Sequence, residues 1–230
     1  MIGHNHLGKN GRFGNQMFQY AATRGLAAKH KYDWCIPDGP RTDEEFVDEE
    51  NQHKLFMAFK MEGAKVVKDH PAPYEQEGSF TFDHRLFLYC PDNVNLYGYF
   101  QCEKYFKDIE KEIRKDFTWR DDVRSLCQDM FDSIGGKAIS LHIRRTDHLV
   151  KPTYHPVLPL SYYEKALEII DTLSLDRQKN LPVLVFSDDP EWCHKQEFFS
   201  DDRFMISDSG DNITDMCLMS MCQYQIMANS

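Results

Sequence analysis

The sequence lacks any run of about 18 consecutive apolar residues, the length that a membrane-spanning helix needs. Its first residues, Met1–His6, also lack the basic and apolar regions of a signal peptide. We therefore predict a cytoplasmic protein without a transmembrane segment. Peripheral association with a membrane stays open as an alternative.

No Cys-x-x-Cys pair occurs among the seven cysteines, so the sequence suggests neither a disulfide framework nor a zinc site. His4 and His6 have no further convincing ligands nearby, and we predict no metal. Basic residues are in the minority: the formal net charge is -10 and the isoelectric point is about 5.4. This balance argues against a nucleic-acid partner and favours a small anionic ligand.

The sequence does contain enough apolar material for a core, since 41% of its 230 residues are hydrophobic. In the stretch Ile139–Asp147, a short apolar run that is typical of a buried strand ends in two adjacent arginines. Because strand side chains alternate, Leu141 and Ile143 share one face, and His142 and Arg144 share the other.

Two neighbouring guanidiniums at the carboxyl end of a buried strand need an anion. One alternative is an ion-pair corner in which Asp147 holds Arg145. We favour a phosphate site, because planar forked donors suit phosphate oxygens and because open α/β sheets bind ligands at strand ends.

In the N-terminal half, the first strong signal is the glycine turn Gly11–Gln16, followed by an alanine-rich helical pattern over Met17–Ala28. We expect a helix here with Asn15 near its N-cap. The acidic segment Asp43–Glu50 predicts a solvated face, with acceptor binding as the minority alternative. The patterns further on predict a strand over 96–101, helices over 103–117 and 121–131, and a linker over 133–136.

After this linker, strands and helices alternate, which predicts a doubly wound parallel sheet. The expected elements are strand 137–143, helix 161–172, strand 182–187, helix 189–197, strand 203–206, helix 212–222 and strand 224–228. We therefore predict an N-terminal lobe over residues 1–134 and a C-terminal lobe over 135–230. His142–Asp147, Ser187–Asp189 and Asn229–Ser230 should share one rim, where strand ends roughly 10–15 Å apart suit a nucleotide sugar.

Several motifs in one order resemble the alpha-1,2-fucosyltransferases of glycosyltransferase family 11, with relatives among alpha-1,6- and protein O-fucosyltransferases. The similar stretches are Gly11–Ala21, Gly98–Gln101, Lys104–Phe106, His142–Asp147, Tyr162–Ala166, Phe186–Trp192 and Asp215–Ser220. The resemblance implies an α/β fold of the GT-B type, with two Rossmann-like lobes and a nucleotide-sugar cleft between them.

The resemblance also implies an inverting transfer of fucose from GDP-fucose to the 2-hydroxyl of a galactose-type acceptor glycan, without a metal or cofactor. Arg144 would grip the pyrophosphate, Asp215 would bind guanine, and Asn15 would reach across the cleft. His142 and Arg145 would order the phosphate site. The full set of expected donor contacts is Arg12, Gly14, Asn15, His142, Arg144, Arg145, Ser187, Asp188, Asp215, Asn229 and Ser230.

Arg144, Asp147 and Asn15 are the expected catalytic residues, and Asp147, His155 and Asp188 stay open as candidates for the general base. Members of the family continue beyond the position of Ser230, so we expect an incomplete C-terminal lobe. Two other functions stay open: a noncatalytic nucleotide-sugar or glycan-binding protein, and a transferase that uses another nucleotide sugar.

Overall fold

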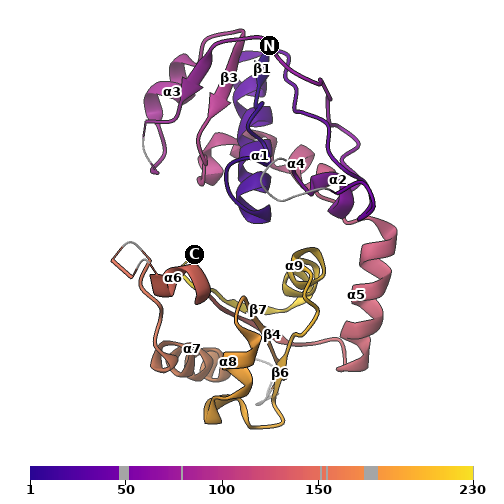
Figure 1. The fold of residues 1–230 in the computed structure, drawn as a ribbon, viewed down its shortest axis with the longest axis vertical. Helices are drawn as coiled ribbons and strands as arrows, with labels where there is room; N and C mark the ends of the chain where they lie inside the picture. Colours follow the sequence, from indigo (N-terminus) through magenta and orange to yellow (C-terminus); the bar gives the residue numbers. More distant parts are fainter. Residues whose placement is uncertain (47–51, 79, 151, 154, 174–180, 230) are drawn as a thin grey trace. The chain divides into compact units, whose positions relative to one another are not determined.

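The chain divides into two compact units in the computed structural model, Met1–Arg120 and Asp121–Ser230 (Figure 1). The structure describes residues 1–46, 52–78, 80–150, 152–153, 155–173 and 181–229. The division lies before the boundary that the sequence predicted after residue 134. It does so because helix α5 (Asp121–Ser133) packs against helix α9 (Asn212–Met221) of the second unit.

The first unit contains a parallel sheet with its strands in the order β1 (Ile2–Gly3), β3 (Val94–Tyr97) and β2 (Tyr74–Gln76). The chain leaves β3 earlier than predicted, because Gly98 and Phe100 both take positive φ angles (+157° and +53°) that end the extended conformation. The helical elements of this unit are α1 (Phe13–His30), α2 (Leu55–Ala58), α3 (His84–Tyr89), η1 (Glu103–Tyr105), η2 (Lys107–Ile109) and α4 (Glu110–Asp116).

Helix α1 begins at Phe13, inside the stretch Gly11–Gln16 that the sequence indicated as a glycine turn, and four residues before the predicted helical pattern, which started at Met17. Gly11 has φ +86°, and Arg12 is the N-cap residue, with an extended backbone and no side-chain capping bond. Asn15 therefore lies inside the first turn of α1 and does not cap it. Its side chain is left to make other contacts.

The helix predicted over 103–117 is broken into η1, η2 and α4. The reason is a close approach between α1 and the start of this segment. A Cβ atom on Gly25 would lie 2.2 Å from the carbonyl oxygen of Tyr105 and 2.7 Å from the Cα atom of Phe106. Tyr105 is buried by this packing, with 1% of its surface exposed.

The alternation predicted for the second unit is confirmed. Its strands are all parallel and lie in the order β6 (Phe204–Ile206), β5 (Val183–Ser187), β4 (Ile139–Ile143) and β7 (Tyr224–Ile226). The other helical elements are α6 (Thr146–Val150), α7 (Leu160–Leu173), α8 (Pro190–His194) and η3 (Glu197–Phe199). The predicted helix 189–197 thus ends early and continues as a separate 3-10 turn.

The strand order explains why helices cover both faces of this sheet. The chain moves from β4 to β5 to β6 through α7 and α8, and then returns past them to β7 through α9. Since such crossovers are right-handed, the reversal puts α9 on the opposite face from α7 and α8, as Figure 1 shows.

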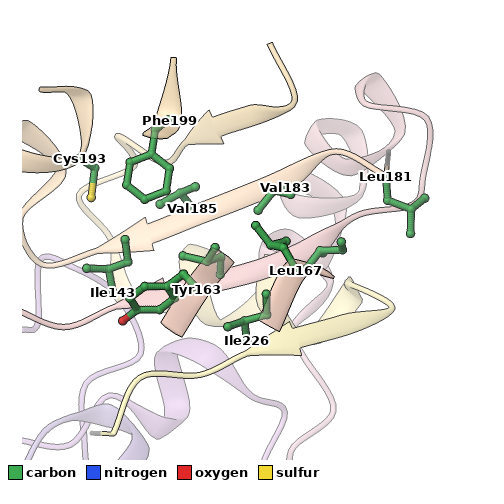
Figure 2. Packing of buried hydrophobic residues seen from close by; sticks show 11 residues of the cluster. Ile143, Tyr163, Leu167, Leu181, Val183, Val185, Cys193, Phe199 and Ile226 are labelled. Carbon is green, nitrogen blue, oxygen red and sulfur yellow. The ribbon is translucent and has the colours of Figure 1, made fainter. Parts of the chain in front are cut away.

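The core under α7 and α8 is formed by the inward side chains of the central strands (Figure 2). Tyr163 and Leu167 of α7 pack against Leu141 of β4 and Val183 and Val185 of β5, and each of these residues is at most 5% exposed. Burial of this kind supplies most of the stabilisation of a unit of this size. It also fixes the strand ends on which the polar residues lie.

None of the helices in the described parts of the chain combines the length and the apolar character that crossing a membrane requires.

Candidate functional site

The carboxyl ends of β4 and β5 lie side by side, as the sequence predicted. Ile143 pairs in register with Ser187, so the residues that follow these two leave the sheet together. These are Arg144 and Arg145 on one strand and Asp188 and Asp189 on the other. We call Arg144, Arg145, Asp147, Asp188 and Asp189 the arginine cluster.

Arg144 is the most enclosed guanidinium of this cluster, with 14% of its side chain exposed. Its Nη2 atom lies 2.8 Å from Oδ1 of Asp147, and its Nη1 atom lies 3.3 Å from Oδ2 of Asp188. Its Nε atom is buried and has no hydrogen-bond partner within the described residues. A buried donor without an acceptor is unfavourable, so this nitrogen is a place for an incoming oxygen.

Arg145 is held by different groups from those the ion-pair alternative named. Its Nε atom lies 3.1 Å from Oδ2 of Asp189, and its Cζ atom lies 3.8 Å from the ring centroid of Trp192. Asp147 pairs with Arg144 instead, because it lies three residues further along, in the first turn of α6. The ion-pair corner that the sequence offered as an alternative therefore exists, with the pairs Arg144–Asp147 and Arg145–Asp189.

Asp188 joins the two strand ends. Its Oδ1 atom accepts the backbone N–H of Arg145 at 2.8 Å, and its Oδ2 atom accepts the hydroxyl of Thr146 at 2.5 Å. Asp189 caps α8 by accepting the backbone N–H of Trp192 at 3.2 Å, and its own N–H donates to the hydroxyl of Ser187 at 3.0 Å. Sequence reasoning missed Thr146 and Trp192 as parts of this arrangement, although both lie inside motifs that it quoted.

Two histidines lie close to the cluster. Burial, followed by the charge of Arg144, lowers the pKa of His142. Burial also lowers the pKa of His148, whose ring stacks on the exposed His155 with centroids 4.8 Å apart. Both shifts favour the neutral imidazole near neutral pH.

Asp215 lies in the first turn of α9, beside the end of β6. Its Oδ1 atom accepts hydroxyl hydrogen bonds from Ser207 at 2.7 Å and from Ser209 at 2.8 Å. Burial raises the pKa of this carboxyl group above its usual value, against the effect of the two hydroxyls. The two serines were not singled out by the sequence, since hydroxyls in a loop carry no local signal of their own.

The end of the chain makes contacts near the loop before α7. Asn229 donates from Nδ2 to the carbonyl oxygen of Pro156 at 2.7 Å, and Tyr162 donates to the carbonyl oxygen of Met227 at 3.0 Å. Ser230, which the sequence also placed on this rim, lies outside the described residues.

The remaining predicted residues belong to the first unit. Arg12 is exposed, and a Cβ atom on Gly14 would meet nothing within 4 Å, so packing within the unit does not require glycine there. Asn15 accepts a hydrogen bond at Oδ1 from Nε2 of Gln101 at 2.6 Å.

In the described ranges, His, Cys, Asp and Glu side chains form no group of three or more that could hold a metal ion.

The second unit carries paired arginines at the carboxyl rim of its parallel sheet, which is the edge where open α/β sheets bind ligands. The profile of glycosyl transferase family 11 matches residues 1–230. The chain belongs to this family and is a glycosyltransferase, so the resemblance stated from the motifs is confirmed.

Known relatives agree with this assignment. The chain is 27% identical to the O-antigen biosynthesis glycosyltransferase WbnK of Escherichia coli over 265 residues (96% of this chain, 85% of the relative). It is also 27% identical to an alpha-1,2-colitosyltransferase of Escherichia coli over 243 residues (96% and 82%). A galactoside alpha-(1,2)-fucosyltransferase 1 of Rattus norvegicus is 25% identical over 234 residues (94% and 58%).

Among solved structures, the fucosyltransferase NodZ from Bradyrhizobium shares the fold, with a TM-score of 0.56 and 12% sequence identity over 96% of this chain and 82% of that one. The predicted fold class, a GT-B-like α/β protein with parallel sheets, is thereby confirmed.

Proposed function

We propose that the protein transfers fucose from GDP-fucose to the 2-hydroxyl of a galactose-type acceptor, with inversion at the sugar carbon and without a metal ion. The observation that carries the proposal is Arg144: a guanidinium at the carboxyl rim whose buried Nε atom has no acceptor within the described residues. The donor is further supported by NodZ, an alpha-1,6-fucosyltransferase whose crystals were soaked with GDP-fucose.

The proposed reaction requires a positive group beside the leaving phosphate, and the guanidinium of Arg144 can provide it. When the bond between the sugar carbon and the β-phosphate oxygen breaks, the electron pair leaves with GDP and the sugar becomes oxocarbenium-like. A fixed guanidinium stabilises this developing negative charge without having to reorganise. Its forked donors also suit two phosphate oxygens at once.

The carboxylates of the arginine cluster outnumber its two guanidiniums. Binding of a diphosphate at this rim therefore depends on directed hydrogen bonds, with little help from net charge. Asp188 helps to orient the Arg144 guanidinium. Its hydrogen bonds to the backbone of Arg145 and the hydroxyl of Thr146 hold the backbone from which Arg144 projects.

The acceptor hydroxyl loses its proton as its oxygen forms the new bond to the sugar carbon. Asp147, Asp188 and His155 are the candidate bases. The two aspartates already bind Arg144, whereas His155 is exposed and stacks on the neutral His148. Substituting Asp147 with Asn, Asp188 with Asn and His155 with Gln separately, and measuring the pH dependence of turnover, distinguishes the three candidates.

The experiment uses the intact chain with GDP-fucose and a β-galactoside in the presence of EDTA. We expect a fucosylated product whose anomeric configuration, read by NMR, is inverted relative to the donor. An unchanged rate after EDTA treatment supports metal independence. Finding neither transfer nor slow hydrolysis of GDP-fucose would exclude this function.

A second candidate function is the transfer of another nucleotide-linked sugar, and a specific observation supports this candidate. One of the relatives is named an alpha-1,2-colitosyltransferase and is as similar as the O-antigen enzyme, at 27% identity. The arginine cluster would contact phosphate and leaves the sugar unspecified. Comparing GDP-fucose with GDP-mannose, and GDP with UDP, separates the choice of sugar from the choice of base.

A further inference from the structure

Three aromatic side chains lie together at the surface of the first unit. The ring centroid of His6 lies 5.1 Å from that of Tyr74 and 5.1 Å from that of Tyr97, and the two tyrosine rings are 6.3 Å apart. All three pairs meet edge to face. Tyr74 is 53% exposed and Tyr97 is 37% exposed, although burial of rings of this size contributes strongly to stability. We call His6, Tyr74 and Tyr97 the tyrosine–histidine cluster.

The cluster lies where strands of the first sheet end. Tyr97 is the last residue of β3, and His6 follows the end of β1 by three residues. Tyr74 begins β2 and pairs in register with Asn95 of β3, so its side chain is on the same face of the sheet as that of Tyr97. Open α/β sheets bind ligands at the carboxyl ends of their strands, and the position of the cluster is therefore suited to binding.

Two asparagine side chains tie together the segments that carry these rings. Asn5 donates from Nδ2 to Oδ1 of Asp69 at 2.7 Å and to the carbonyl oxygen of His70 at 3.1 Å. Its Oδ1 atom accepts the backbone N–H of His70 at 3.2 Å. Asn95 is fully buried and donates from Nδ2 to the carbonyl oxygens of His70 at 2.6 Å and Ala72 at 3.0 Å. The segments are thus held in place before a ligand binds, which lowers the entropic cost of binding.

The cluster is uncharged and offers both apolar and polar contacts. Burial, followed by the charge of Lys9, lowers the pKa of His6, so its imidazole is neutral near neutral pH. In the part of the chain that the structure describes, no hydrogen bond involves the hydroxyl of Tyr74 or that of Tyr97. A neutral molecule with C–H groups and hydroxyls suits such a surface better than an ion or a purely apolar chain does.

We propose that the tyrosine–histidine cluster binds a sugar ring of a neutral glycan that carries β-galactose. One face of β-galactose presents a continuous row of C–H groups, which are weakly positive and pack against the negative face of an aromatic ring. The hydroxyls of the same sugar can pair with the tyrosine hydroxyls. The choice of galactose rests on the proposed function, in which a galactose-type glycan is the acceptor. Every residue of this surface belongs to the first unit.

The experiment titrates the intact chain with lactose, a β-galactoside, in the absence of GDP-fucose and follows binding by saturation-transfer NMR. We expect saturation to be strongest at the C–H protons of the apolar face of galactose. Tyr74→Leu keeps an apolar side chain but removes the ring, and it should weaken binding roughly threefold to tenfold. Tyr74→Phe keeps the ring and loses only the hydroxyl, so the affinity should fall less.

The matched control is Tyr89→Leu, because Tyr89 is 73% exposed in α3 of the same unit and lies outside the cluster. It should leave the affinity for lactose unchanged. Melting temperatures show whether each variant folds. If Tyr74→Leu does not fold, Tyr97→Leu takes its place with the same expected loss.

Absence of lactose binding, or equal affinity in the unsubstituted protein and Tyr74→Leu, would overturn the proposal. The cluster would instead belong to a contact between copies of the chain if Tyr74→Leu abolished self-association, measured by sedimentation, and left lactose binding intact. If lactose binds as expected but the chain neither transfers fucose nor hydrolyses GDP-fucose, the proposed function fails and the glycan surface stands. If fucose is transferred and Tyr74→Leu binds lactose as before, the surface fails and the function stands.

Discussion

Nη2 of Arg144 lies 2.8 Å from Oδ1 of Asp147, three residues further along the chain, and this pair occupies part of the fork that a diphosphate would use. Under the proposed function, Asp147 would compete with a phosphate oxygen for the same donor. The same contact also keeps the guanidinium in place when no ligand is bound. The two effects predict opposite results for binding and for catalysis when the carboxylate is removed.

Asp147→Asn should therefore bind GDP more tightly, by about threefold to tenfold, because a negative charge disappears beside the phosphate site. Turnover should fall if Asp147 also accepts the proton of the acceptor. Calorimetry with GDP and a transfer assay separate the two effects. Weaker binding of GDP in Asp147→Asn would contradict the competition. Asp208→Asn, which removes an exposed carboxylate paired with His194, is the control for the change in charge.

Arg144→Ala should reduce turnover by roughly a hundredfold or more, since a single oriented donor to the leaving oxygen is worth about 3–4 kcal/mol in the transition state. Arg144→Lys keeps the charge but loses the fork and the Nε donor. It should recover only a small part of that loss. Single-turnover kinetics with GDP-fucose measure both. A lysine variant with nearly full activity would show that charge alone is needed at this position.

Trp192 is expected to act through Arg145. The guanidinium carbon lies 3.8 Å from the ring centroid, and such contacts contribute about 0.5–2 kcal/mol. Trp192→Leu keeps an apolar side chain at the start of α8 but removes the π-face. We expect a severalfold increase in the KM for GDP-fucose with a modest loss of thermal stability. An unchanged KM would mean that the bond to Asp189 alone holds Arg145.

The parts of the fold that the sequence predicted are those in which local pattern and packing agree. The apolar runs that became β4 and β5 are buried on the sheet, and their ends carry the arginines and aspartates that the motifs indicated. The helix over 103–117 was predicted wrongly because Tyr105 and Phe106 pack onto Gly25, a contact between residues 80 positions apart that no local pattern contains. The same applies to Arg145, whose partners Asp189 and Trp192 come from the next strand and helix.

Replacing Asp215 is expected to change both the stability of the fold and the affinity for GDP. Burial raises the pKa of its carboxyl group, so the folded state favours the protonated form more than the unfolded state does. Any stability from this group is present below the unfolded-state pKa and is lost as the pH rises through the raised value. At neutral pH the charge therefore opposes folding. Asp215→Asn, whose carboxamide oxygen can still accept the hydroxyls of Ser207 and Ser209, should raise the melting temperature at pH 7.

The same variant should bind GDP less well if Asp215 contacts guanine as the family resemblance implies, because Oδ1 accepts the hydroxyls of Ser207 and Ser209 and leaves Oδ2 to accept from the donors of the guanine edge, whereas a carboxamide would place its NH2 group there. The loss should be roughly tenfold to a hundredfold, the effect of a hydrogen bond to a charged group. It should be smaller for inosine diphosphate, whose base lacks the exocyclic amine. In the unsubstituted protein, affinity for GDP should fall as the pH is lowered through the raised pKa, and this dependence should vanish in Asp215→Asn. A variant that is more stable and binds GDP as well as before would show that the buried charge serves neither folding nor the nucleotide.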